Sequence, residues 1–271
     1  MHTKISPDNP YGHNRHGFAW ENVPGNSVAH LDFGCYDGAF LNMLKDKNIG
    51  RLVGVDVSEE AVKKGQRLYP ELEIIKIREA TALPFDDGVF SSATILDVLE
   101  HVYEQTELLA ELNRVLKDGG KLIVTVPGRH LFSFLDIGNL KFRFPRLHRW
   151  YYCLRHSREE YEYRYVSNPD GLTGDISAKK HWHEHFGRNK FSKLLIEAGF
   201  RVIDFDGAGL FARLIGNVAY LFQWIKPIKI ALGELAKLDS KFFESANLFC
   251  VAEKHQNIQE KYSQPDSNNT G

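Results

Sequence analysis

Between residues 28 and 127 the chain alternates short apolar runs with amphipathic stretches, and this alternation limits the fold more than any other feature. Helical spacing of apolar residues separates the runs, as at 39–47 and 104–116. The runs themselves lie at 28–33, 52–57, 73–77, 89–96 and 121–126. Because continuously apolar strands that alternate with helices belong to parallel sheets covered on both faces, we expect an α/β fold.

Two longer segments interrupt this alternation. Residues 128–184 are rich in Arg, His, Phe and Tyr, and residues 208–243 carry apolar residues at helical spacing on both sides of Pro227. The pattern resumes around them with a helix and two further apolar runs, at 188–198, 200–205 and 247–252. We therefore interpret the two segments as insertions into one α/β domain.

The composition is that of an ordinary soluble globular protein. Apolar residues make up 43% and charged residues 25%, which excludes a chain disordered throughout, a collagen-like fibre and a disulfide-stapled miniprotein. The net charge of −1 provides no overall attraction to nucleic acid or anionic lipid. The cysteines show no paired or metal-type spacing, and no signal peptide or membrane-spanning run is visible. We expect a cytoplasmic location.

A glycine-containing turn follows the first apolar run, where the chain passes from strand to helix. From 31 to 38 it reads Leu-Asp-Phe-Gly-Cys-Tyr-Asp-Gly. Glycine permits a positive φ and lets a ligand approach the backbone closely, and ligands of open α/β sheets bind beyond the carboxyl ends of the strands. Asp56 closes the next strand, where it is placed to accept hydrogen bonds from two ribose hydroxyls. The turn therefore predicts a nucleotide site.

The charge of this turn favours a cationic ligand over a dinucleotide. The pattern G-x-G-x-x-G is absent, because only Gly34 and Gly38 are glycines and Tyr36 stands between them. Asp32 places a carboxylate just before the turn, which suits an ammonium or sulfonium group better than a phosphate. We therefore expect S-adenosylmethionine (SAM) as the cofactor, with S-adenosylhomocysteine as its product, rather than NAD.

Six segments in order resemble the class I SAM-dependent methyltransferases, especially the small-molecule type with L-P-F and L-E-H segments. They are residues 31–38, 54–58, 78–90, 97–102, 112–121 and 191–200. The likeness extends over residues 28–127 and 185–206, and the order of the motifs makes it more specific than one glycine turn. Tyr36 stands where the family usually has glycine, and Glu79 where it usually has aspartate.

The resemblance implies a fold and a set of cofactor contacts. The fold is a Rossmann-like sheet of seven strands, mostly parallel, with helices on both faces and the last strand antiparallel. Asp56 would hold the ribose, Glu79 would face the adenine amino group, and Asp97 would line the methionine pocket. The residues implied to contact the cofactor are Asp32, Gly34, Cys35, Tyr36, Gly38, Asp56, Val57, Glu79, Ala80, Leu96 and Asp97.

The predicted domain organisation is simple. One methyltransferase domain covers residues 1–255, and residues 256–271 form a disordered tail poor in apolar residues. We expect an irregular N-terminal arm over 1–27. The basic, aromatic insertion at 128–184 and the apolar, helical insertion at 208–243 would cap the domain.

Two histidines are candidates for a general base. His101 follows the fourth strand, near the expected sulfonium, and a neutral imidazole is the natural base at pH 7; the alternative is an imidazole that caps the next helix. His183 is the middle histidine of the run 181–185, in which alternate positions share one face of an extended chain. Because such positions lie about 6.5–7 Å apart, we expect no metal there. A place in the substrate pocket and a polar loop edge both stay open.

The composition of the two insertions indicates which kinds of acceptor the protein could bind. Residues 139–158 hold six Arg or Lys and no acid, interleaved with aromatic residues. This pattern suits a phosphate, a sugar ring or nucleic acid, or else a solvated cap. In the second insertion Trp224, Lys226 and Lys229 fit a membrane interface, although its apolar stripe also fits ordinary core packing.

We therefore predict a SAM-dependent methyltransferase that acts on an oxygen of a small-molecule, sugar or lipid-linked acceptor. An RNA methyltransferase that uses the basic insertion is the first alternative, although the neutral net charge disfavours nucleic acid. A SAM-binding protein without turnover is the second. Peripheral contact with the inner membrane surface through residues 208–243 accompanies the lipid-linked version. The sequence predicts no oligomeric state.

Overall fold

The computed structural model of the chain describes most of the domain. The described residues are 15–129, 144–163, 166, 184–208, 210–211, 214–215, 218–219, 222, 224–242 and 247–255.

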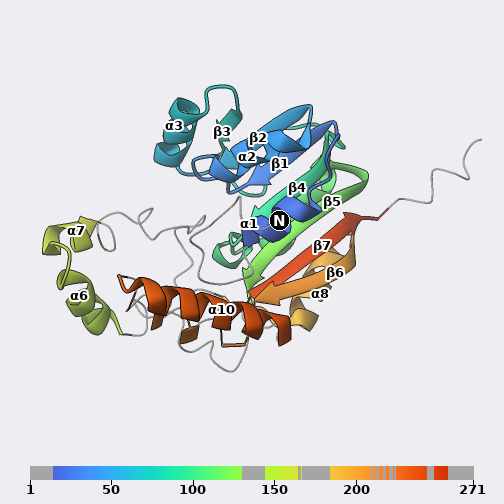
Figure 1. The fold of residues 1–271 in the computed structure, drawn as a ribbon. Coiled ribbons are helices and arrows are strands. Elements are labelled where there is room, and N and C mark those ends of the chain that lie inside the picture. Colours follow the sequence, from blue (N-terminus) through green and yellow to red (C-terminus); the bar gives the residue numbers. More distant parts are fainter. Residues whose placement is uncertain are drawn as a thin grey trace, which may run out of the picture.

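Seven strands of the described residues form one sheet, in the order β3-β2-β1-β4-β5-β7-β6 (Figure 1). β7 runs antiparallel to both of its neighbours, and the other pairs are parallel. The predicted Rossmann-like sheet with an antiparallel last strand is therefore confirmed. The strands are β1 (Ala29–Phe33), β2 (Arg51–Asp56), β3 (Glu73–Lys76), β4 (Phe90–Leu96), β5 (Leu116–Pro127), β6 (Phe200–Ala208) and β7 (Asn247–Lys254).

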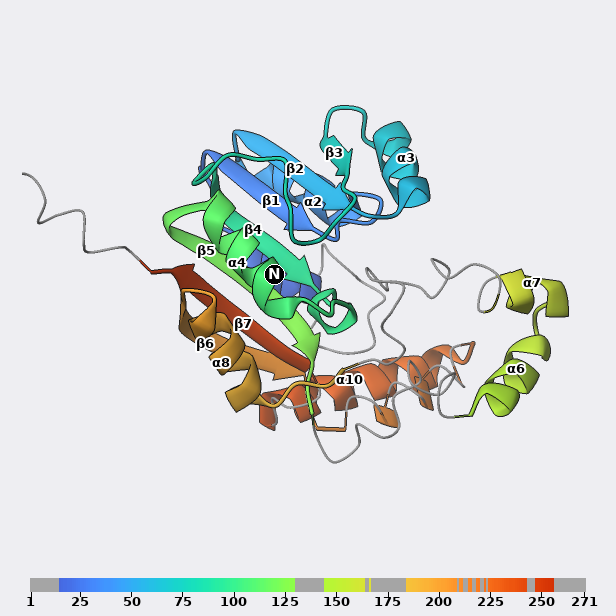
Figure 2. The same cartoon turned by 180° about the vertical axis from the view of Figure 1, so that it is seen from behind.

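Helices cover both faces of the sheet, as the continuously apolar strands require (Figures 1 and 2). One apolar layer packs α4 and α8 against the sheet, and the other packs α1, α2 and α3 against it. The described helices are α1 (Arg15–Asn22), α2 (Ala39–Met43), η2 (Leu44–Lys47), α3 (Glu59–Leu68), η3 (Leu99–His101), α4 (Gln105–Val115), α6 (Pro145–Cys153), α7 (Arg158–Glu162), α8 (Arg188–Glu197) and α10 (Lys226–Phe242).

Successive side chains of each strand pack alternately into the two apolar layers. Leu122 and Val124 of β5 belong to the layer with α4, whereas Ile123 belongs to the layer with α1. Successive residues of a strand point to opposite faces, so a strand buried on both sides carries apolar residues on both of its faces. Ser58 begins α3 as its sequence predicts, because its hydroxyl accepts a hydrogen bond from Ala61 N (3.3 Å).

Part of the N-terminal arm is not irregular. Residues 15–22 form α1, which buries Phe18 with its ring centre 5.3 Å from that of Phe249 in β7. The prediction of an irregular arm was therefore wrong for these residues. The helix is only eight residues long and shows too little periodicity to reveal itself, and tertiary packing of its apolar face stabilises it.

Smaller boundaries also differ. The helix predicted over 39–47 changes from α to 3₁₀ geometry at Leu44, and strand β5 begins at Leu116 rather than at Lys121. Pro227 is the second residue of α10, where its missing N–H has no intrahelical partner to lose.

The two insertions leave the sheet at one edge. Pro127, the last residue of β5, and Ala208, the last of β6, both pair with Asn247 at the start of β7. The ends of β1 and β4 lie at the same edge, because these strands run parallel to β5. The insertions therefore begin at the edge that carries the glycine turn.

Candidate cofactor site

The turn after β1 adopts a conformation that favours glycine. Gly34 and Gly38 both have a φ of 75°. A Cβ on Gly34 would lie 2.5 Å from Val98 Cγ2, and a Cβ on Gly38 would lie 2.5 Å from Ile74 Cδ1. Both the positive φ and the close neighbours therefore select glycine at these two positions.

Replacing Gly34 with alanine is expected to lower the free energy of unfolding by about 2 kcal/mol, because it adds left-handed strain to a clash with Val98. Urea unfolding measures the change. Gly187→Ala is the control, since Gly187 has a φ of −79° and nothing within 4 Å of an added Cβ; as an N-cap substitution it should cost no more than about 1 kcal/mol. Equal stability of wild type and Gly34→Ala would contradict the conclusion that the turn requires glycine at position 34.

The two residues that follow Gly34 point in opposite directions. Cys35 is buried, and its Sγ would lie 2.6 Å from a Cβ on Gly54 of β2. Tyr36 is 60% exposed, and Lys64 Nζ lies 5.5 Å from the centre of its ring. Of the two predicted contact residues, Cys35 therefore offers only its backbone to a ligand in the turn, and Tyr36 directs its phenol to solvent.

Asp56 joins the turn to the end of β2. Its Oδ2 accepts a hydrogen bond from Tyr36 N (2.8 Å), and its Oδ1 accepts one from Ser58 N (2.8 Å). Tyr36 has a φ of 50°, rare for a side-chain-bearing residue, and the bond to Asp56 holds it there. Burial raises the pKa of the Asp56 carboxyl, and the backbone hydrogen bonds oppose that shift. Asp56 therefore fixes the turn, and each of its oxygens keeps a lone pair for a ligand hydroxyl.

Asp32 is a buried carboxyl at the centre of the sheet edge. It is 3% exposed, and its Oδ1 accepts a hydrogen bond from Thr94 Oγ1 in β4 (2.7 Å). Burial raises its pKa to about 7, with a contribution from Asp56, while the bond from Thr94 lowers it. A buried carboxyl of this kind gains most from a cationic ligand, so the residues of the turn fit SAM as the sequence predicted.

Asp97 lies just beyond β4 and is held from two sides. Its Oδ1 accepts a hydrogen bond from Thr125 Oγ1 (2.7 Å), and its Oδ2 forms an ion pair with Arg15 of α1. Its φ of 54° places it in the left-handed region next to Leu96, the last residue of β4. The structure therefore brings Asp97 to the same edge as the turn and adds a guanidinium that the sequence analysis missed.

Helix α1 contributes a second neighbour to this edge. His16 stacks on Phe40 of α2 with ring centres 5.4 Å apart. Burial and the neighbouring Arg15 lower the pKa of His16 to about 4, against a smaller opposing effect of Asp97. The signal in the sequence is faint: an Arg-His pair within an arm that otherwise resembles a polar tail.

The predicted adenine contacts lie beyond β2 and β3. Ile77 N donates a hydrogen bond to Asp56 O (2.9 Å), which brings the segment after β3 beside Asp56. Glu79 is exposed there, while Val57 and Ala80 are half-buried. All three residues therefore follow the carboxyl ends of β2 and β3, at the same edge of the sheet as the turn.

His101 ends the short helix η3, next to the end of β4. It is 7% exposed, and its Nε2 lies 3.9 Å from Glu100 Oε1. The other base candidate, His183, lies outside the described residues. Its neighbour Glu184 accepts a hydrogen bond from Gln105 Nε2 (2.8 Å), and the same amide group bonds Leu99 O of η3 (3.1 Å). The structure therefore brings the chain next to His183 close to the helix that carries His101.

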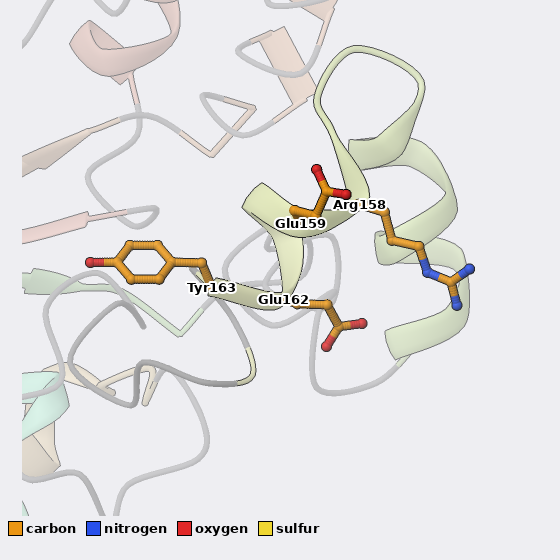
Figure 3. A pocket seen from close by; sticks show the side chains of 4 residues that line it. All are labelled: Arg158, Glu159, Glu162 and Tyr163. Atoms are coloured by element: carbon orange, nitrogen blue, oxygen red, sulfur yellow. The ribbon is translucent and has the colours of Figure 1, made fainter.

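A hollow at α7 is lined by side chains that do not converge on one point. It measures about 430 Å³ and is lined by Arg158, Glu159, Glu162 and Tyr163 at α7. Figure 3 shows these side chains pointing in different directions. Within the described part of the chain, no group of three His, Cys, Asp or Glu residues could hold a metal ion.

This mostly parallel sheet, with an acidic glycine turn after β1 and an acid at the end of β2, matches the Rossmann-like fold of solved methyltransferase structures. Residues 31–124 match the family model described as methyltransferase domain. The match shows a methyltransferase domain over these residues, and the eleven residues predicted to contact the cofactor lie within the matched range.

Known proteins support the same assignment. The chain is 39% identical over 102 residues to a demethylmenaquinone methyltransferase of Renibacterium salmoninarum, covering 38% of this chain and 41% of that one. It is 29% identical over 166 residues to a demethylmenaquinone methyltransferase of Staphylococcus aureus, covering 58% and 62%. The crystal structure of a SAM-dependent methyltransferase from Mesorhizobium loti aligns with a TM-score of 0.54 at 15% identity, covering 89% and 98%. The chain thus spans less than two thirds of both sequence relatives.

Proposed function

We propose that this protein transfers a methyl group from SAM to an oxygen of a small acceptor molecule that has an apolar part. The observation that carries the proposal is the buried Asp32 carboxyl beside the glycine turn, with Asp56 at the next strand end. SAM, when bound, supplies a methyl group on a positively charged sulfur. Asp32 would bind the ammonium group and Asp56 the ribose hydroxyls.

The remaining cofactor contacts follow from their places along the edge. Arg15 and Asp97 form an ion pair beside the turn, and its guanidinium suits the methionine carboxylate. Glu79 would accept a hydrogen bond from the adenine amino group, with Val57 and Ala80 against the ring. Leu96 and the backbone of Gly34, Cys35, Tyr36 and Gly38 would complete the pocket.

The chemistry needs positioning and, for a hydroxyl nucleophile, a base. A displacement that discharges a sulfonium is favoured by surroundings of low polarity and by in-line placement of the acceptor. His101 is buried beside the end of β4, and we propose that it acts as the general base that accepts the proton of the acceptor hydroxyl. His183 is the second candidate, because the chain next to it is tied to η3 through Gln105.

An apolar cavity supports an acceptor with an apolar part. It measures about 280 Å³ and lies between α10 and the described residues Phe211, Leu214, Ile215 and Val218, with Leu232 of α10 among its walls. Both elements belong to the insertion that follows β6 at the edge of the turn. The names of the two curated relatives give demethylmenaquinone as acceptor, which agrees with a partly apolar molecule.

Exposed apolar side chains on the same insertion support membrane contact. Trp224, Ile230 and Leu238 are more than half exposed, and Lys226 and Lys229 lie near the start of α10. No helix in the described part of the chain is long and apolar enough to cross a bilayer. Peripheral binding to the cytoplasmic face of a membrane is therefore part of the proposal.

Release of S-adenosylhomocysteine in the presence of candidate acceptors tests the function. The panel contains phenols, sugars, a prenylated quinol, a lipid-linked sugar and total RNA. Turnover with a hydroxyl acceptor is expected, and His101→Gln should lower kcat by about a hundredfold while leaving SAM affinity within twofold. SAM binding without turnover on any acceptor would favour the non-catalytic alternative, and turnover on RNA alone would favour the RNA methyltransferase.

A further inference from the structure

A line of polar side chains lies behind Asp32, inside the apolar layer between the sheet and helices α1 and α2. His30 Nδ1 lies 2.8 Å from Ser92 Oγ, and His30 Nε2 lies 3.1 Å from Thr94 Oγ1. Thr94 Oγ1 in turn lies 2.7 Å from Asp32 Oδ1. His30, Ser92 and Thr94 are all fully buried. Three consecutive hydrogen bonds thus end on the carboxyl to which the proposed function assigns the ammonium group of SAM.

The strand register produces this line. His30 pairs with Ser92, and Asp32 pairs with Thr94, across the parallel strands β1 and β4. Residues two apart on a strand share a face, so the four side chains lie on the same side of the sheet. Apolar residues at 30, 92 and 94 would avoid the cost of burying polar groups. Stability of the fold therefore does not explain these polar residues, and a functional role does.

Chemistry fixes the direction of the three bonds when Asp32 is ionised. A carboxylate only accepts, so the Thr94 hydroxyl donates to Asp32 and must itself accept from His30 Nε2–H. Burial, with a contribution from Lys47, lowers the pKa of His30 to about 3, so the imidazole is neutral. Its Nδ1 then has no proton and accepts from the Ser92 hydroxyl.

We propose that His30 and Thr94 are positioning residues, which orient a hydroxyl donor onto Asp32 and so hold it as a carboxylate for the ammonium group of SAM. The inference rests on the proposed cofactor role of Asp32. Thr94 touches the carboxylate, and His30 acts through Thr94 by fixing the direction of its hydroxyl.

The pH dependence of binding gives this role a signature. The groups that act on Asp32 are Thr94, which lowers its pKa, and Asp56, which raises it. Since the pKa of Asp32 is about 7, affinity for an ammonium ligand should rise as pH increases from 5.5 to 7.5. Removing the Thr94 hydroxyl should raise the pKa further and move this rise to higher pH.

Calorimetric titration with two ligands tests the proposal. S-adenosylhomocysteine carries the ammonium group, and 5′-methylthioadenosine lacks the whole amino-acid part. Thr94→Val should weaken S-adenosylhomocysteine about tenfold at pH 7, corresponding to one lost charged hydrogen bond, and leave methylthioadenosine within twofold. Thr94→Ser should restore the wild-type affinity, and His30→Gln should reproduce part of the loss. Equal weakening of both ligands by Thr94→Val, or an unmoved pH profile, would overturn the role.

Two further readouts keep the outcome clear. Nitrogen NMR of the wild-type protein with S-adenosylhomocysteine should show His30 protonated at Nε2, and a proton at Nδ1 would refute the bond directions even if the variants fail to fold. Asp32→Asn separates the two proposals. If it leaves S-adenosylhomocysteine affinity unchanged, the proposed cofactor site fails; if it weakens binding and Thr94→Val does not, only the positioning role fails.

Discussion

Replacing Asp56 with alanine is expected to weaken SAM binding by more than about a hundredfold. The substitution would remove the hydrogen bonds between the Asp56 carboxylate and the ribose, which are worth about 1.5–3 kcal/mol for a charged acceptor. It would also release Tyr36 N and Ser58 N, both 2.8 Å from its oxygens. Tyr36 has a φ of 50°, so without this bond the turn is free to relax into a shape that does not fit the cofactor. Calorimetry with SAM measures the loss.

Two variants separate the contributions. Asp56→Asn keeps one oxygen acceptor and should therefore lose less affinity than alanine. Asp86→Ala removes an exposed aspartate of the loop between β3 and β4 and should leave affinity within twofold. An affinity of Asp56→Ala within threefold of wild type would place the ribose elsewhere and remove the assigned site.

The sequence revealed the sheet and the two acids because both follow from short-range patterns. Runs that are mostly apolar mark strands buried on two faces; Asp56 is the last residue of β2, and Asp32 lies one residue before the end of β1. In a parallel sheet those ends meet at one edge, so the candidate cofactor residues gather without any detail of side-chain packing.

Arg15 and His30 escaped prediction for a different reason. Arg15 reaches Asp97 from a helix 82 residues away in sequence, and nothing local to either residue signals the pair. His30 sits inside an apolar run, where its partners come from β4 through the strand register. Such partnerships are set by tertiary structure, which the periodicity of one segment does not encode.

The identity of the acceptor could not be predicted from the sequence for a third reason. The family model ends at residue 124, before both insertions begin. The apolar cavity beside α10 lies in one of them. On the proposed function, acceptor specificity would depend on the part of the chain that lies outside the shared motifs.

Asp32→Asn is expected to stabilise the free protein at neutral pH while it weakens cofactor binding. In wild type the pKa of Asp32 is about 7, raised by burial from 3.8. A carboxyl whose folded pKa is raised contributes stability below its unfolded pKa, and that contribution disappears as pH rises through the folded pKa. Ionising Asp32 should therefore cost the folded state about 3–4 kcal/mol between pH 4 and pH 7.5, a cost that asparagine does not have.

The comparison of the two proteins isolates this group. His16 and His30 have lowered pKa values, about 4 and about 3, so both add stability as pH rises toward 6.5. They are present in both proteins and cancel in the difference. In urea unfolding, the free energy of unfolding of Asp32→Asn minus that of wild type should therefore increase by about 3 kcal/mol between pH 4.5 and pH 7.5. Calorimetry at pH 7.5 should show the SAM affinity of the variant reduced at least tenfold. Parallel stability curves would mean that Asp32 stays ionised throughout and is not desolvated. Opposite changes in stability and affinity at one position would identify a carboxyl that is retained for its ligand and not for the fold.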